Sequence, residues 1–280
     1  MATENFEALG TLPNAPLVLV LAQVLFVPST PNGLEDLRAK VIDALGGEFP
    51  HIAPLYLFNV QINAVEGGQP QQLGQQTLTG YDLRSADQRS VIRLSLDSMT
   101  LAVNSYKSFE SFMETWSRCL ASLSTVGISQ VSRVGLRYVD FIYPTSSRVP
   151  EDYFVPPFDF RGFQPVTGAT GTAQTNALIQ EFPFEEGRMR VQYARGIGNP
   201  ALPVELQGLL EVASIHARPW MVGPTAVFDT DRSIDGLRPS DLTSLQQTFE
   251  LLHTGVSDAF KQFITQSAKD EWSTSREASA

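Results

Sequence analysis

The chain contains one cysteine, Cys119, among its 280 residues. A single thiol excludes an intramolecular disulfide and a thiolate zinc cluster, which is consistent with a reducing cytoplasm. Cys119 lies in a stretch with helically spaced apolar residues, so we expect a packed helix residue rather than a nucleophile. The three histidines, His51, His216 and His253, include no pair at a metal-ligand spacing such as i, i+4. A zinc site is therefore not expected.

Long hydrophobic runs are missing as well. The longest, residues 17–27, has eleven residues and contains Gln23, whereas a transmembrane helix needs roughly 20 apolar residues. The opening residues 1–16 lack a basic start followed by an apolar core, so no secretory signal is expected. These features predict a cytoplasmic protein without a membrane partner.

Positive charge is in deficit. Twenty Lys and Arg residues face thirty Asp and Glu residues, which gives a net charge of -10 and a pI near 4.8. Nucleic acids and anionic membranes attract basic surfaces, so neither is an expected partner. A basic or neutral protein partner fits this charge better, and a homodimer is left open. With 42% hydrophobic residues, the chain has enough apolar material for a substantial core.

The spacing of apolar residues predicts an α+β fold with antiparallel sheets and helices packed on one face. A buried central strand is expected at 17–27, and an apolar stripe predicts one long final helix from about Ser240 to Lys269. The order strand, meander, helix occurs twice, which suggests two similar halves, 1–128 and 129–280, with one compact unit as the alternative. The other expected helices span 34–47 and 108–127, and the other expected strands span 55–66, 78–86, 90–104, 131–144, 177–184, 188–196, 204–217 and 224–231.

The stretch VFDTDRS places Asp229 and Asp231 directly after an apolar run. This pattern resembles the opening motif of haloacid dehalogenase phosphotransferases, but only one long helix and a tail follow it, so the later lysine and acidic pair are missing. As a calcium loop it fails because Ile234 stands where an EF-hand needs glycine. We therefore interpret Asp229 and Asp231 as a strand face, with Asp235 in the following turn. They are weak candidates for a metal site, and no metal or cofactor is expected.

Arginines form the most promising candidate site. Alternation along a strand places Arg133 and Arg137 on one face, and Arg188 and Arg190 share a face in the same way. If the two strands are neighbours, four guanidinium groups line one surface that can bind a carboxylate or phosphate. The favoured alternative is cross-strand pairing with Asp and Glu. His216 is added as a candidate base or ligand contact, although a packed residue is the simpler interpretation.

Four stretches resemble a sporadically distributed, largely uncharacterised bacterial family of about this length. They are LPNAPLVLVLAQVLF at 12–26, VGLRYVDFIYP at 134–144, AVFDTDRS at 226–233 and TFELLHTGVSDAFKQFIT at 248–265. Asp140 stands where the family commonly has asparagine. The resemblance implies a shared fold and a bacterial origin, and the patchy distribution is similar to that of accessory or conflict genes. It implies no established catalytic residues.

Two functions are consistent with these features. No G-x-S-x-G, P-loop or G-x-G-x-x-G motif is present, which favours a protein without catalytic activity. The first hypothesis is therefore a cytoplasmic interaction factor of accessory, immunity, antitoxin-like or defence type. The alternative is a protein that binds a small anion in an arginine-lined pocket, or an enzyme without a familiar motif.

Overall fold

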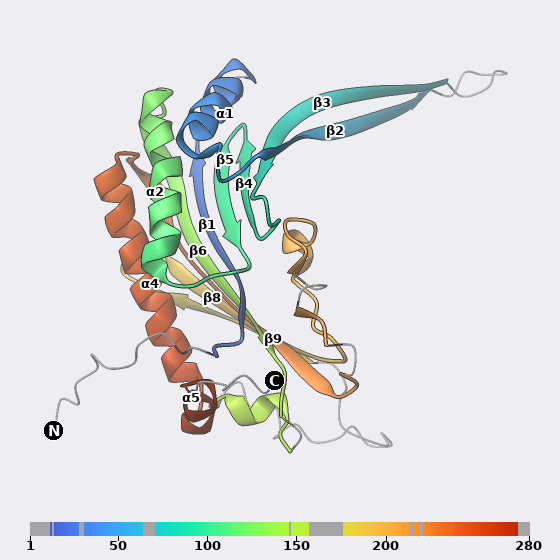
Figure 1. Cartoon of the computed structure of the whole chain (residues 1–280), viewed down its shortest axis with the longest axis vertical. Coiled ribbons are helices and arrows are strands. Elements are labelled where there is room, and N and C mark those ends of the chain that lie inside the picture. The colour runs from blue at the N-terminus through green and yellow to red at the C-terminus, as the bar shows by residue number, and fades with distance from the viewer. Residues whose placement is uncertain are drawn as a thin grey trace.

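A computed structural model describes residues 12, 14–27, 31–63, 71–145, 147–156, 176–212, 216–218 and 221–273. The architecture is one nine-stranded antiparallel sheet with helices against it, which confirms the α+β prediction (Figure 1). The strands are β1 Leu17–Phe26, β2 His51–Asn63, β3 Gln71–Arg84, β4 Ser90–Ser95, β5 Ser98–Val103, β6 Gln130–Ile142, β7 Asn176–Pro183, β8 Arg188–Ile197 and β9 Pro224–Pro239. The helices are α1 Pro31–Leu45, α2 Phe109–Thr125, α4 Leu242–Phe263 and α5 Gln266–Ser273, with short 3-10 helices η2 Pro150–Tyr153 and η4 Val204–Leu206.

The strand order is β2-β3-β4-β5-β1-β6-β9-β8-β7, with β1 beside β6 near the centre. In each half of the chain the first strand pairs with the last, β1 with β5 and β6 with β9. The pairing of β1 with β6 then joins the strands of both halves into one sheet. The division at residue 128 falls between α2 and β6, and the duplication of the two halves stays a prediction.

Helices α1, α2 and α4 cover one face of the sheet. Helix α2 begins where the Ser108 side chain accepts a hydrogen bond from the Ser111 amide, and its apolar stripe is buried because such a stripe leaves water when it faces a sheet. Trp116 of this stripe meets Phe249 of α4 edge-on, with ring centroids 5.8 Å apart. Cys119 is also buried in this core, and burial raises the pKa of its thiol. None of the helices in the described part of the chain is both long and apolar enough to cross a membrane.

The long final helix predicted from Ser240 to Lys269 is interrupted. Helix α4 ends at Phe263 because Ile264 is extended and pairs with Phe154 in an isolated bridge, while the Thr265 amide donates to the carbonyl of Tyr153. These tertiary hydrogen bonds replace the ones that a continuous helix would make. Helix α5 then begins at Gln266.

The strand predicted at 204–217 is wrong in its described part. The chain there forms η4 and a turn through Gly208, whose φ of +78° favours glycine. Three leucines of this segment, Leu206, Leu209 and Leu210, are buried against the sheet face opposite the helices. The spacing of these leucines reflects a folded-back segment that covers part of this face.

Candidate functional site

The four arginines predicted as a ligand site lie on β6 and β8, which β9 separates. Arg137 makes a bidentate interaction with the carboxylate of Asp229 on β9. Its Nε is 2.8 Å from Oδ1 and its Nη2 is 2.6 Å from Oδ2. Its Nη2 also donates to Glu205 of η4 at 2.7 Å. Arg137 is therefore satisfied by carboxylates of its own chain, and the pair ties η4 to the sheet.

The other arginines on this face are more loosely paired. Arg133 lies 3.6 Å from Asp231 and 3.7 Å from Asp235, and Arg188 lies 3.7 Å from Asp235. Arg190 donates to Gln192 at 3.2 Å. Carboxylates of β9 thus lie between the arginines of β6 and those of β8, which the sequence predicted as one candidate cluster.

Arg133 and Arg137 line a hollow of about 300 Å³ on this face, together with Arg93, Glu205 and Asp231. Binding of a ligand by the four arginines stays a prediction, and two carboxylates already stand in the hollow. Across the described part of the chain, no three His, Cys, Asp or Glu side chains are grouped so that they could hold a metal ion.

His216 lies apart from the arginines. It lines a separate hollow of about 500 Å³ with Tyr143 and Arg218. Its backbone carbonyl accepts a hydrogen bond of 2.8 Å from the Tyr143 hydroxyl, and burial lowers the pKa of its imidazole. A role for His216 in ligand binding also stays a prediction.

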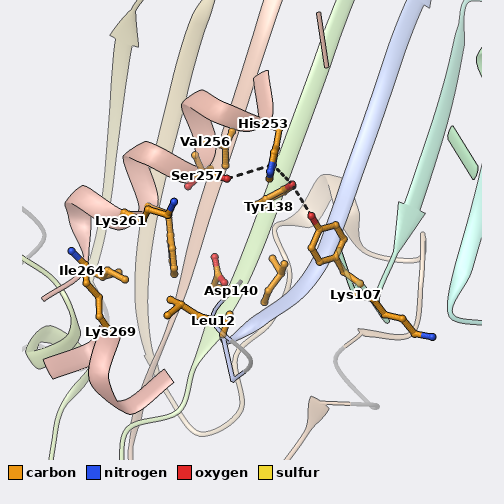
Figure 2. A pocket seen from close by; sticks show the side chains of 15 residues that line it. Leu12, Lys107, Tyr138, Asp140, His253, Val256, Ser257, Lys261, Ile264 and Lys269 are labelled. Carbon is orange, nitrogen blue, oxygen red and sulfur yellow. Dashed lines mark hydrogen bonds between the residues drawn. The ribbon is translucent and has the colours of Figure 1, made fainter. Parts of the chain in front are cut away.

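A different pocket, on the helix-covered face, combines charge with apolar walls. It has a volume of about 360 Å³ and lies between α4, α5 and the strands β1, β6 and β9 (Figure 2). Its walls include the apolar residues Leu12, Leu17, Val256, Phe260 and Ile264. We call this cavity the helix-face pocket. It is within the size range of sites for small molecules, which are mostly apolar with a few placed polar groups.

Lysines gather at the helix-face pocket. The whole chain has four lysines, Lys40, Lys107, Lys261 and Lys269, and the last three line this one pocket. Figure 2 shows Lys261 and Lys269 at one end and Lys107 extending outward at the other. Within the described residues, none of the three makes an ion pair. The pocket is therefore a basic site in a protein with a net charge of -10.

A polar network forms another wall. The hydroxyl of Tyr138 is 2.8 Å from Nδ1 of His253 and 3.3 Å from the hydroxyl of Tyr106, and Ser257 lies 3.4 Å from the same Nδ1. Burial raises the pKa of Tyr138 and lowers that of His253, so the phenol keeps its proton and the imidazole stays neutral. Tyr138 therefore donates to Nδ1, which leaves the ring proton on Nε2. The Phe109 ring stacks on His253 at 3.9 Å and fixes its plane.

Two further polar groups stand at the strand wall of the pocket. Asp140 is buried, and burial together with the charge of Asp229 raises the pKa of its carboxyl well above the usual value. The hydroxyl of Thr230 is also buried and has no hydrogen-bond partner among the described residues. A buried polar group without a partner is costly. Asp140 and Thr230 thus offer hydrogen-bonding capacity that the fold itself leaves unused.

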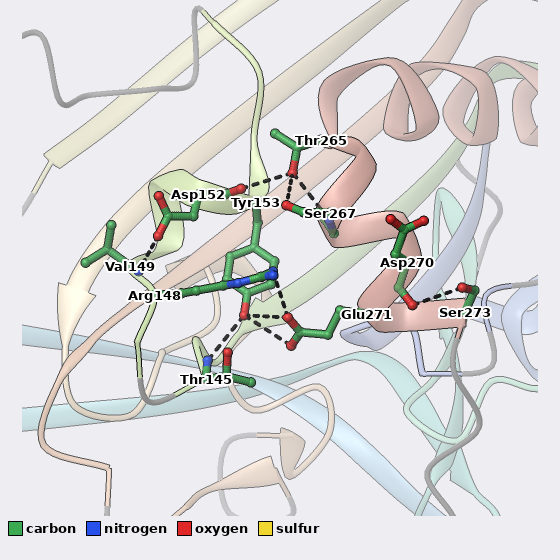
Figure 3. Close-up of polar contacts among 11 residues, drawn as sticks. Thr145, Arg148, Val149, Asp152, Tyr153, Thr265, Ser267, Asp270, Glu271 and Ser273 are labelled. Atoms are coloured by element: carbon green, nitrogen blue, oxygen red, sulfur yellow. Dashed lines mark hydrogen bonds and ion pairs between the residues drawn. The ribbon is translucent and has the colours of Figure 1, made fainter.

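Strand alternation and a helix anchor place these groups. Tyr138 and Asp140 are two residues apart on β6 and both line the pocket, whereas Arg137, the residue before Tyr138, faces the opposite side. Helix α5, which carries Lys269, is held by Glu271. The Glu271 carboxylate forms an ion pair with Arg148 at 2.9 Å and accepts a hydrogen bond from the Tyr153 hydroxyl at 3.1 Å (Figure 3).

A scan against models of known protein families gave no match, and a search of curated proteins found no significant relative. The resemblance to the sporadically distributed bacterial family therefore stays a prediction. The features of the helix-face pocket rest only on the residues of this chain and do not depend on that resemblance.

Sequence reasoning missed the helix-face pocket as a site. Alternation alone was enough to place Tyr138 and Asp140 on one side of a strand. The scarcity of lysine was a second available signal, because three of the four lysines lie at one place. The sequence did not indicate that α4 and α5 would bring Lys261 and Lys269 against β6, since that juxtaposition depends on tertiary packing.

Proposed function

We propose that the protein binds a small organic anion, a carboxylate or a phosphate ester with an apolar body, in the helix-face pocket. The observation that carries this proposal is that three of the four lysines of an acidic chain line this one cavity. An anion gains from the lysines there, although the net charge of the whole chain is negative.

The remaining wall residues suit the same ligand. Burial raises the pKa of Asp140 and so favours its neutral form, in which it does not cancel the lysine charge and can donate a hydrogen bond. Nε2 of His253 carries a proton, and Thr230 has a free donor and acceptor. The apolar residues Val256, Phe260 and Ile264 provide contact for a hydrocarbon body.

Titration calorimetry with phenyl phosphate, benzoate and octanoate tests the proposal, with benzamide as the uncharged counterpart. We expect the anions to bind, benzamide to bind at least tenfold more weakly than benzoate, and added salt to weaken only anion binding. Lys261→Gln and Lys269→Gln should each reduce affinity roughly ten- to hundredfold, because a charge-assisted hydrogen bond contributes about 1.5–3 kcal/mol.

Lys40→Gln provides the matched control. Lys40 is the one lysine outside the pocket, and it lies on α1 with only a long 4.0 Å contact to Asp43. Equal losses in all three variants, or equal affinities for benzoate and benzamide, would contradict a lysine-based anion site.

We infer a second candidate function, a bacterial cytoplasmic interaction factor of accessory, immunity or defence type. Its support is the net charge of -10, which speeds and selects association with a basic protein. Affinity purification from the native cell should then yield one stoichiometric protein partner that is lost at high salt. An unrelated protein of equal net charge is the control. Recovery of the chain with a bound metabolite and no protein partner would instead favour the anion-binding proposal.

A further inference from the structure

Strands β2 and β3 form a ribbon that extends beyond the body of the protein (Figure 1). The neighbouring strand β4 pairs with β3 only from Gly80 to Arg84. Residues 71–78 of β3 therefore pair only with residues 56–63 of β2. An isolated two-stranded ribbon is marginally stable in water, and a third strand is the usual remedy.

The outer edge of the ribbon is open. Strand β2 is the terminal strand of the sheet, and nothing in the described part of the chain pairs with its outer edge. Natural proteins protect such edges with charged residues, especially lysine. Here Glu66 is the one charged residue in the sequence from Ile52 to Tyr81, in a chain of which 18% is charged. Beyond Pro54, the edge thus lacks this protection by charged residues.

Apolar side chains on the ribbon are exposed on both faces. Tyr56 is 45% exposed, Leu57 53% and Phe58 70%. Leu57 and Phe58 are consecutive, so they point to opposite faces. A partner lying against one face would leave the other in water. A strand added to the edge instead brings cross-strand neighbours to both faces at once.

A second copy of the chain is the partner that fits best. Two copies with net charges of -10 repel each other. The ribbon is a surface where they can meet without bringing like charges face to face. An antiparallel edge is complementary to itself across a two-fold axis, which is the commonest symmetry of homo-oligomers. Pro54 lacks an amide donor, so it limits pairing to the segment beyond it, and the length of the ribbon keeps the acidic bodies apart.

We infer that the chain forms a two-fold dimer in which residues 56–63 of β2 pair antiparallel with the same residues of a second copy. This inference is independent of the proposed anion site. The interface consists mainly of backbone hydrogen bonds, with Tyr56, Leu57 and Phe58 gaining neighbours across the new strand pair.

Light scattering and cysteine cross-linking test the dimer. Full-length protein should show a mass approaching twice 30.8 kDa as its concentration rises over about a hundredfold range. Single cysteines introduced in turn at positions 56–62 should form a disulfide-linked dimer at one position, or at two positions on the same face, next to the axis. The native Cys119 is buried and does not interfere. Val222→Cys, 84% exposed and remote from the ribbon in sequence, is the control.

A charge swap gives the decisive result. At the cross-linking position, a lysine variant and a glutamate variant should each raise the dimer dissociation constant at least tenfold, because like charges face each other across the axis. Mixing the two variants should restore the dimer. A mass of one chain at every concentration, cross-linking at all positions including 222, or no recovery on mixing would overturn the inference. Binding of the monomer to neutral lipid vesicles through the same residues would also overturn it and identify a lipid surface as the occupant.

Discussion

Tyr138 of β6 donates a 2.8 Å hydrogen bond to Nδ1 of His253 in α4, joining residues 115 positions apart in the sequence. The bond fixes the tautomer of His253 and connects the strand wall of the helix-face pocket to its helical wall. Because α4 also carries Lys261, the geometry of this bond and the position of that lysine are coupled.

Tyr138→Phe should destabilise the fold by about 1 kcal/mol, since Nδ1 of His253 loses its best donor and keeps only Ser257 at 3.4 Å. Nitrogen NMR of the imidazole should show a larger population of the Nδ1–H tautomer. Tyr106→Phe is the control, because Tyr106 contacts Tyr138 at 3.3 Å and not the histidine. An unchanged tautomer in Tyr138→Phe would contradict the assigned direction of this hydrogen bond.

Asp140→Asn should stabilise the protein at neutral pH. The folded state raises the pKa of this buried carboxyl well above its unfolded value near 3.8. The folded chain therefore holds a proton that the unfolded chain releases, and the free energy of unfolding falls as pH rises above 3.8. Asparagine removes this dependence.

Denaturant unfolding of both proteins across the pH range checks this prediction. The advantage of Asp140→Asn should be greatest near neutral pH and shrink as pH approaches 3.8. A pH-independent difference would show that the carboxyl of Asp140 keeps an ordinary pKa in the folded protein. Aspartate and asparagine have nearly the same size and shape, so the substitution should be accommodated sterically.

Arg137→Met should cost about 3–5 kcal/mol of stability, because it leaves Asp229 buried without its partner. The side chains of this pair are only 11% and 4% exposed. Replacing both residues, as Arg137→Met with Asp229→Leu, should recover most of the loss. Arg133→Met is the control and should cost less than about 1 kcal/mol, since its contacts are 3.6 and 3.7 Å long and more exposed. Equal losses for the two single variants would contradict this ranking.

The sequence predicted the fold better than the site. Alternation correctly placed Arg133 and Arg137 on one strand face, because side-chain direction is a local property of a strand. It did not reveal that β9 lies between β6 and β8, since strand order depends on contacts distant in sequence. For the same reason the break at Ile264 was missed, because pairing with Phe154 overrides the local helical preference. The helix-face pocket depends on long-range contacts of the same kind, because it forms where α4 and α5 pack beside β1, β6 and β9.

Gly255→Ala should destabilise the protein, although alanine is favoured over glycine within a helix by about 1 kcal/mol. A Cβ atom at position 255 of α4 would overlap the guanidinium group of Arg232. That group is buried beneath the helix, donates to the carbonyl of Leu251 at 2.6 Å and lies 4.5 Å from the Phe184 ring centroid. Alanine would therefore displace the guanidinium and break its hydrogen bond.

Testing Gly255→Ala both in the natural protein and in an Arg232→Ala variant separates the steric cost at Arg232 from the effect of helix propensity. In an Arg232→Ala protein the overlap is removed, so Gly255→Ala should become neutral or stabilising there. Thermal unfolding of the four proteins in this cycle measures the coupling, which we expect to exceed 1 kcal/mol. If Gly255→Ala has the same effect in both backgrounds, then Arg232 does not require glycine at this position, and the passage of its side chain beneath α4 is not what constrains the helix.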